Sequence, residues 1–218
     1  MQIFLDTGDI ELVNKYYDMG VVTGVTTNPL LVAKHKIDRM DFIKELMKFE
    51  LESVSVEMIT EKADEMLKEA EAFLDLGESI TIKLPMTAEG LKACKALSSN
   101  EIKVNMTLCF SVYQAILAAE AGAFCVSPFI GRAEDNGIDG KELLEDIYRA
   151  YFQSGVQTRI LAASIRNLDH IKMAALVGAD FATMPPNLID EMLAHELTDA
   201  GQKQFLEAAR GMVGDAQE

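Results

Sequence analysis

Seven β-rich, apolar segments of the chain end in polar side chains. A single serine or threonine at a strand end most often makes only local hydrogen bonds. The same pattern at seven strand ends indicates one functional site if the strands form a parallel barrel, because their carboxyl ends then meet at one face. The residues are Asp6, Thr26, Thr27, Asn28, Glu57, Lys83, Asn105, Thr107, Ser127 and Ser164.

Lys83 is the least expected of these residues, because the segment SITIKLP (79–85) places an amine inside an apolar strand. Desolvation there disfavours the ammonium form and favours the neutral amine, which is a nucleophile towards carbonyl groups. Asp6 and Glu57 would place two carboxylates beside it, which suits the proton transfers of Schiff-base chemistry. A structural ion pair between Lys83 and a carboxylate is the alternative.

Two arginines follow neighbouring strands: Arg132 follows the sixth, and Arg166, with Ser164, follows the seventh. Guanidinium forks that converge on one side of a barrel mouth suit a phosphate dianion. Each arginine could instead pair with a local acid such as Glu134 or Asp169. Their position on loops of the same face favours phosphate binding.

The 35 acidic and 20 basic residues give the 218-residue chain a net charge of −15. This balance repels phosphate backbones and anionic lipid, which argues against nucleic acid or a membrane surface as the main partner. We expect a soluble, cytoplasmic protein, because there is no basic leader and no run of about 18 apolar residues. Cys94, Cys109 and Cys125 lack CxxC spacing and are predicted to be reduced thiols in the core.

The three histidines, His35, His170 and His195, do not fall at strand ends. The pattern therefore favours neither a zinc or iron site nor a Ser-His-Asp triad. The abundance of acidic residues leaves a Mg²⁺ site open.

Eight β-rich segments alternate with amphipathic helical segments, whose charged faces are predicted to form a solvated outer layer. About 27 residues per unit fits a compact (β/α)8 TIM barrel, and glycines end several helices just before a strand. A doubly wound open sheet is the alternative fold, but no glycine-rich phosphate loop follows a strand. The predicted strands are 2–6, 21–27, 53–58, 79–84, 102–107, 124–129, 158–164 and 180–185.

An additional C-terminal helix is predicted over 198–211, where it would cap the barrel or dock on a neighbouring subunit. The polar, glycine-rich stretch 131–142 is predicted to be a loop on the catalytic face. No linker or low-complexity tract divides the chain, so we expect a single domain over 1–218.

Six sequence blocks carry a family resemblance: LDTGDIE (5–11), GVTTNP (24–29), IKLPMTAEGLKA (82–93), NMTLCFS (105–111), VSPFIGR (126–132) and AASIRN (162–167). In these blocks the sequence resembles transaldolases, specifically the short class shared with fructose-6-phosphate aldolases. The resemblance implies a Schiff-base lysine at Lys83, proton transfer by Asp6, and a carboxylate at Glu57 that works with Thr107 through a catalytic water. It also implies substrate contacts by Thr27, Asn28, Asn105, Ser127 and Phe129, and a phosphate site formed by Arg132, Ser164 and Arg166.

A transaldolase transfers a dihydroxyacetone unit from fructose 6-phosphate or sedoheptulose 7-phosphate to erythrose 4-phosphate or glyceraldehyde 3-phosphate in the non-oxidative pentose phosphate pathway. The resemblance implies this activity without a metal or organic cofactor, in a homo-oligomer that is a pentamer or a decamer.

The first alternative is a fructose-6-phosphate aldolase, which releases free dihydroxyacetone. That branch usually has Gln and Tyr where this chain has Glu57 and Phe129, so the chain follows the transaldolase pattern. The second alternative is a non-catalytic sugar-phosphate-binding barrel, which would bind ligand without forming an imine.

Overall fold

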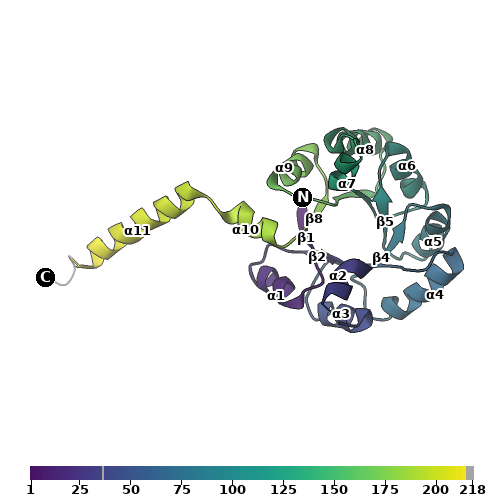
Figure 1. Cartoon of the computed structure of the whole chain (residues 1–218), viewed down its shortest axis with the longest axis horizontal. Helices are drawn as coiled ribbons and strands as arrows, with labels where there is room; N and C mark the ends of the chain where they lie inside the picture. Colours follow the sequence, from purple (N-terminus) through teal and green to yellow (C-terminus); the bar gives the residue numbers. More distant parts are fainter. Residues whose placement is uncertain (36, 215–218) are drawn as a thin grey trace. The chain divides into compact units, whose positions relative to one another are not determined.

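In the part of the chain that the computed structural model describes, residues 1–35 and 37–214, eight parallel strands close into a barrel (Figure 1). Each strand pairs with the next one along the chain, and β8 pairs with β1. The prediction of a (β/α)8 barrel is confirmed, and the closed sheet excludes the doubly wound alternative. The strands are β1 (Gln2–Asp6), β2 (Gly24–Thr26), β3 (Ser53–Glu57), β4 (Ile80–Pro85), β5 (Val104–Cys109), β6 (Cys125–Pro128), β7 (Arg159–Ala162) and β8 (Phe181–Met184).

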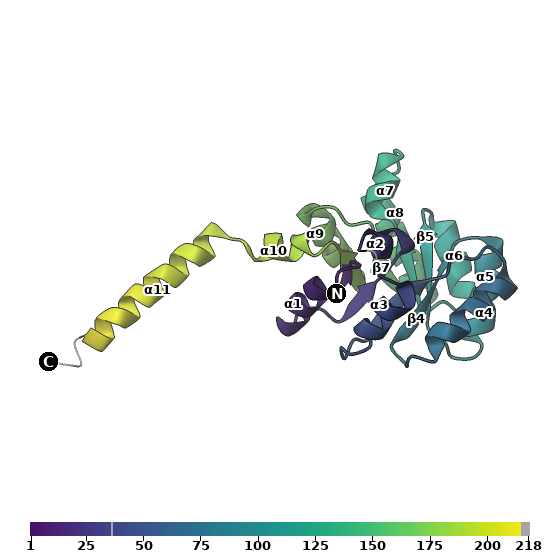
Figure 2. The ribbon, with the colours of Figure 1, turned by 60° about the horizontal axis from the view of Figure 1, so that its bottom comes forward.

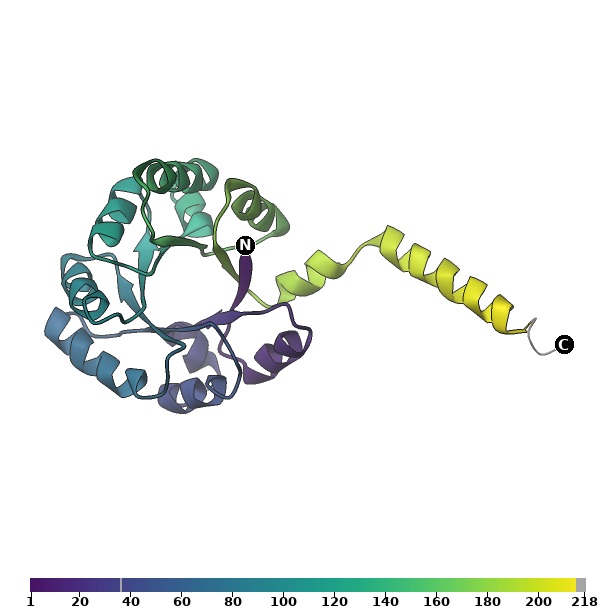
Figure 3. The same cartoon turned by 180° about the vertical axis from the view of Figure 1, so that it is seen from behind.

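Helices surround the barrel, as the views from opposite sides in Figures 1 and 3 show. Most begin after an Asp, Asn, Ser or Thr whose side chain accepts a backbone N–H of the first turn. Two end at a left-handed glycine, Gly155 or Gly178, as predicted. They are α1 (Ile10–Asp18), α2 (Pro29–Lys34), α3 (Arg39–Leu46), α4 (Ala63–Leu74), α5 (Ala88–Ser98), α6 (Val112–Glu120), α7 (Ile130–Asp135), α8 (Gly140–Ser154) and α9 (Leu168–Val177).

Alternate residues of each strand face the barrel interior, as the pleat of a strand requires. Phe4 and Phe181 fill the interior towards the amino-terminal ends of the strands, with ring centroids 4.8 Å apart. A Cβ atom at Gly24 would lie 2.7 Å from the Phe4 ring, so this packing requires glycine. The hydroxyls of Ser53 and Thr81 are hydrogen-bonded at 2.8 Å, so polar side chains in the interior satisfy each other.

The stretch 131–142 is mostly helical, and its prediction as a loop was wrong. α7 spans Ile130–Asp135, and α8 begins at Gly140. The backbone N–H of Gly131 donates to the carbonyl of Ser164 at 3.1 Å, so α7 begins against the segment that follows β7. Figure 2 shows α7 standing at one end of the barrel.

Two strands, β2 and β7, are at least three residues shorter than predicted. β2 begins only at Gly24 of the predicted strand 21–27, and it ends at Thr26 because Asn28 already caps α2. β7 ends before the end of the predicted strand 158–164, where Ser164 has a positive φ of 56° that a strand cannot accommodate.

The three cysteines are free and buried, as predicted. Burial raises the pKa of the Cys94 thiol to about 12 and that of the Cys109 thiol to about 11. These thiols therefore stay protonated at neutral pH and act as apolar core residues.

The chain divides into two compact units, Met1–Pro186, which holds the barrel, and Asn187–Glu218. The described residues of the second unit form α10 (Asn187–Leu193) and α11 (Glu196–Gly214). The predicted C-terminal helix over 198–211 lies within α11 and is confirmed. Among the described residues, no helix is both long and apolar enough to cross a membrane.

Candidate active site

A cavity of about 120 Å³ lies among the carboxyl ends of the strands. Eight of the twelve predicted site residues line it, and the remaining four, Glu57, Thr107, Thr27 and Arg166, do not. The residues that line the cavity are Asp6, Thr26, Asn28, Lys83, Asn105, Ser127, Phe129, Arg132, Leu161, Ala163, Ser164 and Thr183.

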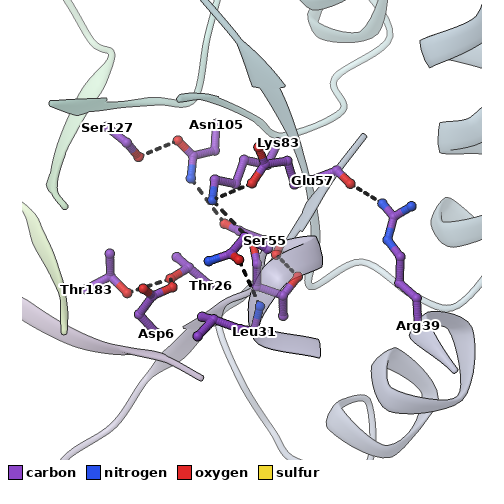
Figure 4. A network of polar contacts seen from close by, with 12 residues as sticks. Asp6, Thr26, Leu31, Arg39, Ser55, Glu57, Lys83, Asn105, Ser127 and Thr183 are labelled. Carbon is purple, nitrogen blue, oxygen red and sulfur yellow. Dashed lines mark hydrogen bonds and ion pairs between the residues drawn. The ribbon is translucent and has the colours of Figure 1, made fainter. Parts of the chain in front are cut away.

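The amine of Lys83 lies inside the barrel, and only 5% of the residue's surface is exposed. β3 and β4 place Glu57 directly beside Lys83 in the sheet, and a Glu57 Oε2 atom lies 3.0 Å from Lys83 Nζ (Figure 4). Nζ also donates to the Thr27 carbonyl at 3.3 Å. The ion pair is therefore present, and because the amine also lines the cavity, it belongs to a site open to a ligand.

Asp6 is held by a chain of two hydroxyls. Thr26 Oγ1 donates to Asp6 Oδ1 at 3.0 Å, and the hydroxyls of Thr26 and Thr183 are 2.6 Å apart. Because Thr26 uses its proton for Asp6, Thr183 must donate to Thr26. Burial raises the pKa of the Asp6 carboxyl above its ordinary value, while the charge of Lys83 and the hydrogen bond from Thr26 oppose the rise.

Three further polar side chains face the cavity from different elements. Asn28 Oδ1 accepts the N–H of Leu31 at 3.0 Å as the cap of α2, which leaves its amide N–H groups for a ligand. Ser127 donates to Asn105 Oδ1 at 2.6 Å, and Asn105 Nδ2 lies 3.4 Å from Ser55 Oγ (Figure 4). The orientation of the Asn105 amide is thus fixed from both sides.

Thr107 is fully buried, and its hydroxyl has no hydrogen-bond partner among the residues that the structure describes. A buried hydroxyl of this kind is available to a water molecule or a substrate. Thr27, by contrast, donates its hydroxyl to the carbonyl of Ser55 at 2.9 Å. Its neighbour Thr26 lines the cavity instead.

Arg132 and Ser164 both line the cavity, and α7, which carries Arg132, begins against the segment that follows β7. A Cβ atom at Gly131 would lie 2.5 Å from the Ser164 carbonyl oxygen, so the approach requires glycine. The guanidinium of Arg132 lies 5.1 Å from the centroid of the Phe129 ring. One cation and one hydroxyl therefore face the cavity where the sequence predicts phosphate.

Arg166 makes a two-pronged ion pair with Asp135, at 2.6 and 2.5 Å. This bond lowers the pKa of the Asp135 carboxyl. The sequence pointed to Glu134 or Asp169 as competing acids, whereas Glu134 pairs with His170 at 2.9 Å. The structure thus places Arg166 beside α7 but not in the cavity lining.

Sequence reasoning missed three residues of the lining that lie in β7, directly after β7 and in β8: Leu161, Ala163 and Thr183. The first two are apolar and carry no chemical signal. Thr183 is a polar residue of the eighth strand, so the argument from strand ends could have found it.

Among the described residues, no group of three or more His, Cys, Asp or Glu side chains is placed to hold a metal ion. The cavity lining itself offers the amine of Lys83, the carboxylate of Asp6 and several hydroxyls. An amine that lines a cavity together with one carboxylate, Asp6, and pairs with a second, Glu57, can attack a carbonyl and exchange protons with the product.

Comparison with known proteins agrees with this arrangement. The family model "Transaldolase/Fructose-6-phosphate aldolase" matches residues 3–217. A protein named "Probable transaldolase" from Dinoroseobacter shibae is 48% identical over 206 residues, which cover 94% of this chain and 95% of that protein. A protein of the same name from Paracoccus denitrificans is 48% identical over 205 residues, 94% of each chain. The chain belongs to the transaldolase/fructose-6-phosphate aldolase family.

Proposed function

We propose that this protein is a transaldolase that transfers a dihydroxyacetone unit between sugar phosphates through an imine on Lys83. The observation that carries the proposal is the buried amine of Lys83, which lines the cavity and lies 3.0 Å from Glu57 Oε2. Asp6 faces the same cavity and supplies a second carboxylate. The names of the relatives support the same activity.

In the first half of the reaction, Lys83 Nζ attacks the C2 carbonyl of fructose 6-phosphate or sedoheptulose 7-phosphate. Glu57 accepts a proton from Nζ and returns it to the C2 hydroxyl, which leaves as water and gives the iminium. The unpartnered hydroxyl of Thr107 suits the positioning of a water molecule for this exchange. The iminium then serves as the electron sink, so we expect no metal or organic cofactor.

In the second half, Asp6 accepts the proton of the C4 hydroxyl while the C3–C4 bond breaks. The bond electrons move into the iminium and leave an enamine on Lys83, and glyceraldehyde 3-phosphate or erythrose 4-phosphate departs. The enamine carbon then attacks the other aldehyde, and Asp6 returns the proton to the new hydroxyl. The raised pKa of Asp6 suits a group that must both accept and return this proton.

The remaining predicted residues bind the substrate in this proposal. The side chains of Asn28, Asn105 and Ser127 contact its hydroxyls, and Thr27 acts through its carbonyl on Lys83. Arg132 and Ser164 bind the phosphate. The positive charge of Arg132 offsets locally the net charge of −15 that the chain carries. Arg166 joins them by exchanging Asp135 for the phosphate.

Phe129 favours a transaldolase over an aldolase that releases free dihydroxyacetone. Its ring lines the cavity but has no hydroxyl that could protonate the enamine. The enamine would therefore persist on Lys83 until an aldehyde acceptor arrives.

The experiment that tests the proposal measures glyceraldehyde 3-phosphate formed from fructose 6-phosphate, with and without erythrose 4-phosphate. We expect sustained turnover only with the acceptor. Comparable turnover without it, with free dihydroxyacetone accumulating, would make the protein an aldolase. Binding of fructose 6-phosphate without an imine that borohydride can reduce would make it a non-catalytic binding barrel.

The protein also acts, in our proposal, as a cytoplasmic homo-oligomer, either a pentamer or a decamer. α11 exposes Leu197, Phe205 and Leu206, and apolar side chains of this size on one helix are typical of an interface. Light scattering after size-exclusion chromatography tests the assembly, and a mass of one chain at micromolar concentration would contradict it.

A further inference from the structure

Arg39 and Glu69 lie outside the cavity and hold the segment that follows β3. The guanidinium of Arg39, the first residue of α3, donates to the backbone carbonyl of Glu57 (Figure 4). It also pairs with Glu69 Oε1 at 2.5 Å, so one side chain links β3 to α4. We call Arg39 and Glu69 together the β3 clamp.

Glu69 holds the next residues of the same segment. Its carboxylate accepts the backbone N–H of Ile59 at 3.0 Å and that of Thr60 at 3.3 Å. It also accepts the hydroxyl of Thr60 at 3.1 Å. The clamp therefore fixes the backbone at Glu57 and again two and three residues later.

The clamp differs from ordinary charge pairs on the helix surface. Lys48 pairs with Glu45, and Lys92 with Glu89, each three residues away in the sequence, with at least 38% of each side chain exposed. In the clamp the exposed fractions are 21% for Arg39 and 16% for Glu69. The Arg39 guanidinium also lies 4.6 Å from the centroid of a phenylalanine ring of α4, Phe73. Its planar fork is thus fixed by stacking as well as by charge.

Schiff-base chemistry requires that the position of Glu57 does not depend on its ion pair with Lys83. The ion pair with Lys83 is the one side-chain contact that the structure gives to the Glu57 carboxylate among the described residues. When Lys83 loses its proton to become a nucleophile, that charge attraction is lost. Glu57 must nevertheless stay in reach of the amine to return the proton, so its position has to be set from elsewhere.

We infer that Arg39 and Glu69 are positioning residues for Glu57, because they hold its backbone in place independently of the charge on Lys83. This inference rests on the proposed role of Glu57 in proton transfer. It concerns two residues that do not line the cavity.

The test measures the rate at which fructose 6-phosphate forms an imine on Lys83, by rapid mixing and quenching with borohydride. Arg39→Met removes both donors, and Glu69→Gln removes the charge opposite Arg39 while keeping a backbone acceptor. We expect each variant to slow imine formation by about 10-fold or more with little change in KM, because small misplacements of catalytic groups have effects of this size. Arg39→Lys keeps the charge but not the fork, so it should restore only part of the rate.

Arg159→Met is the matched control. Arg159 also pairs with a glutamate, Glu52 at 3.3 Å, and lies over aromatic rings, but at the opposite end of the barrel. We expect this variant to form the imine at the rate of the unmodified protein. A thermal melt of each variant checks that it folds.

A double-mutant cycle with Glu57→Gln separates the possible failures. If the clamp acts through Glu57, Arg39→Met has no further effect on imine formation in the Glu57→Gln background. A full additional loss there, or clamp variants as fast as Arg159→Met, would overturn the inference while leaving Glu57 its role. Imine formation at the unmodified rate in Glu57→Gln itself would overturn the role of Glu57, and the inference with it.

Discussion

At the amino-terminal end of the barrel Glu52 is bonded to Gln2 at 2.7 Å and to Arg159 at 3.3 Å, whereas at the carboxyl-terminal end Lys83 faces a cavity. The guanidinium of Arg159 also lies 5.1 Å from the ring centroid of Phe124. Charged groups at the amino-terminal end thus bond across strands and cover the aromatic interior.

The carboxyl-terminal end has the same kinds of residue but leaves bonding capacity unused. Lys83 pairs with Glu57, yet Lys83 and Asp6 also line the cavity, and the hydroxyl of Thr107 has no hydrogen-bond partner among the described residues. The chemical type of a buried charged residue therefore does not reveal its role. What distinguishes the two ends is whether the protein itself satisfies each polar group.

Replacing the cation at the carboxyl-terminal end should separate the two ends most strongly. We expect Lys83→Met to lower turnover of fructose 6-phosphate with erythrose 4-phosphate by about 10⁴-fold or more, because no other group replaces the nucleophile. The far-ultraviolet circular dichroism spectrum should stay unchanged. Turnover within 10-fold of that of the unmodified protein would contradict the assignment of the nucleophile to Lys83.

Asp6→Asn should lower turnover by about 10²- to 10⁴-fold, the usual contribution of a positioned acid–base group. Steady-state kinetics with both substrates measures the loss. An undiminished kcat would assign the C4 proton to a different group.

Asp6→Asn should also change how the free energy of unfolding depends on pH. Because burial raises the pKa of Asp6 in the folded protein, its contribution to stability is full below the unfolded pKa and is lost as pH rises through the folded pKa. Asn does not titrate, so the free energy of unfolding of Asp6→Asn should rise relative to that of the unmodified protein as the pH increases above about 4, the ordinary pKa of a carboxyl group. Urea unfolding of both proteins at a series of pH values measures the difference, and a constant difference would contradict the raised pKa of Asp6.

Thr26→Val should have a smaller effect, which appears in the pH dependence. The hydrogen bond from Thr26 lowers the pKa of Asp6, so its loss should raise that pKa further. Because Asp6 must be ionised to accept the C4 proton, the acidic limb of the kcat profile should move to higher pH. A limb at the same pH would show that the hydroxyl chain does not tune Asp6.

Arg159→Met should have the smallest effect. Its ion pair with Glu52 is partly exposed, with side-chain exposures of 44% and 37%, so we expect a loss of about 1 kcal/mol or less in the free energy of unfolding. kcat and KM should not change. A clear loss of turnover would mean that the two ends of the barrel are coupled.

The sequence was sufficient to predict the barrel and the amine, because both follow from local patterns. Alternation of β-rich and amphipathic segments indicates the (β/α)8 fold, and a lysine in an apolar strand is conspicuous. The choice between Thr26 and Thr27 depends on which face of a three-residue strand meets the cavity, which so short a segment specifies weakly.

Contacts between residues distant in the sequence could not be predicted from local patterns. Arg166 and Asp135 are 31 positions apart, and Arg39 and Glu69 are 30 apart. The charged faces of the helices were predicted to be solvated, which is the usual case, whereas the clamp is largely covered. Only the closed barrel brings α3, α4 and the end of β3 together.

The role of Lys83 is tested most directly by borohydride reduction in the presence of fructose 6-phosphate, followed by peptide mapping by mass spectrometry. We predict a reduced sugar adduct on Lys83 alone, and none in Lys83→Met. An adduct on another lysine, or turnover without any adduct, would contradict the assignment of the chemistry to this amine.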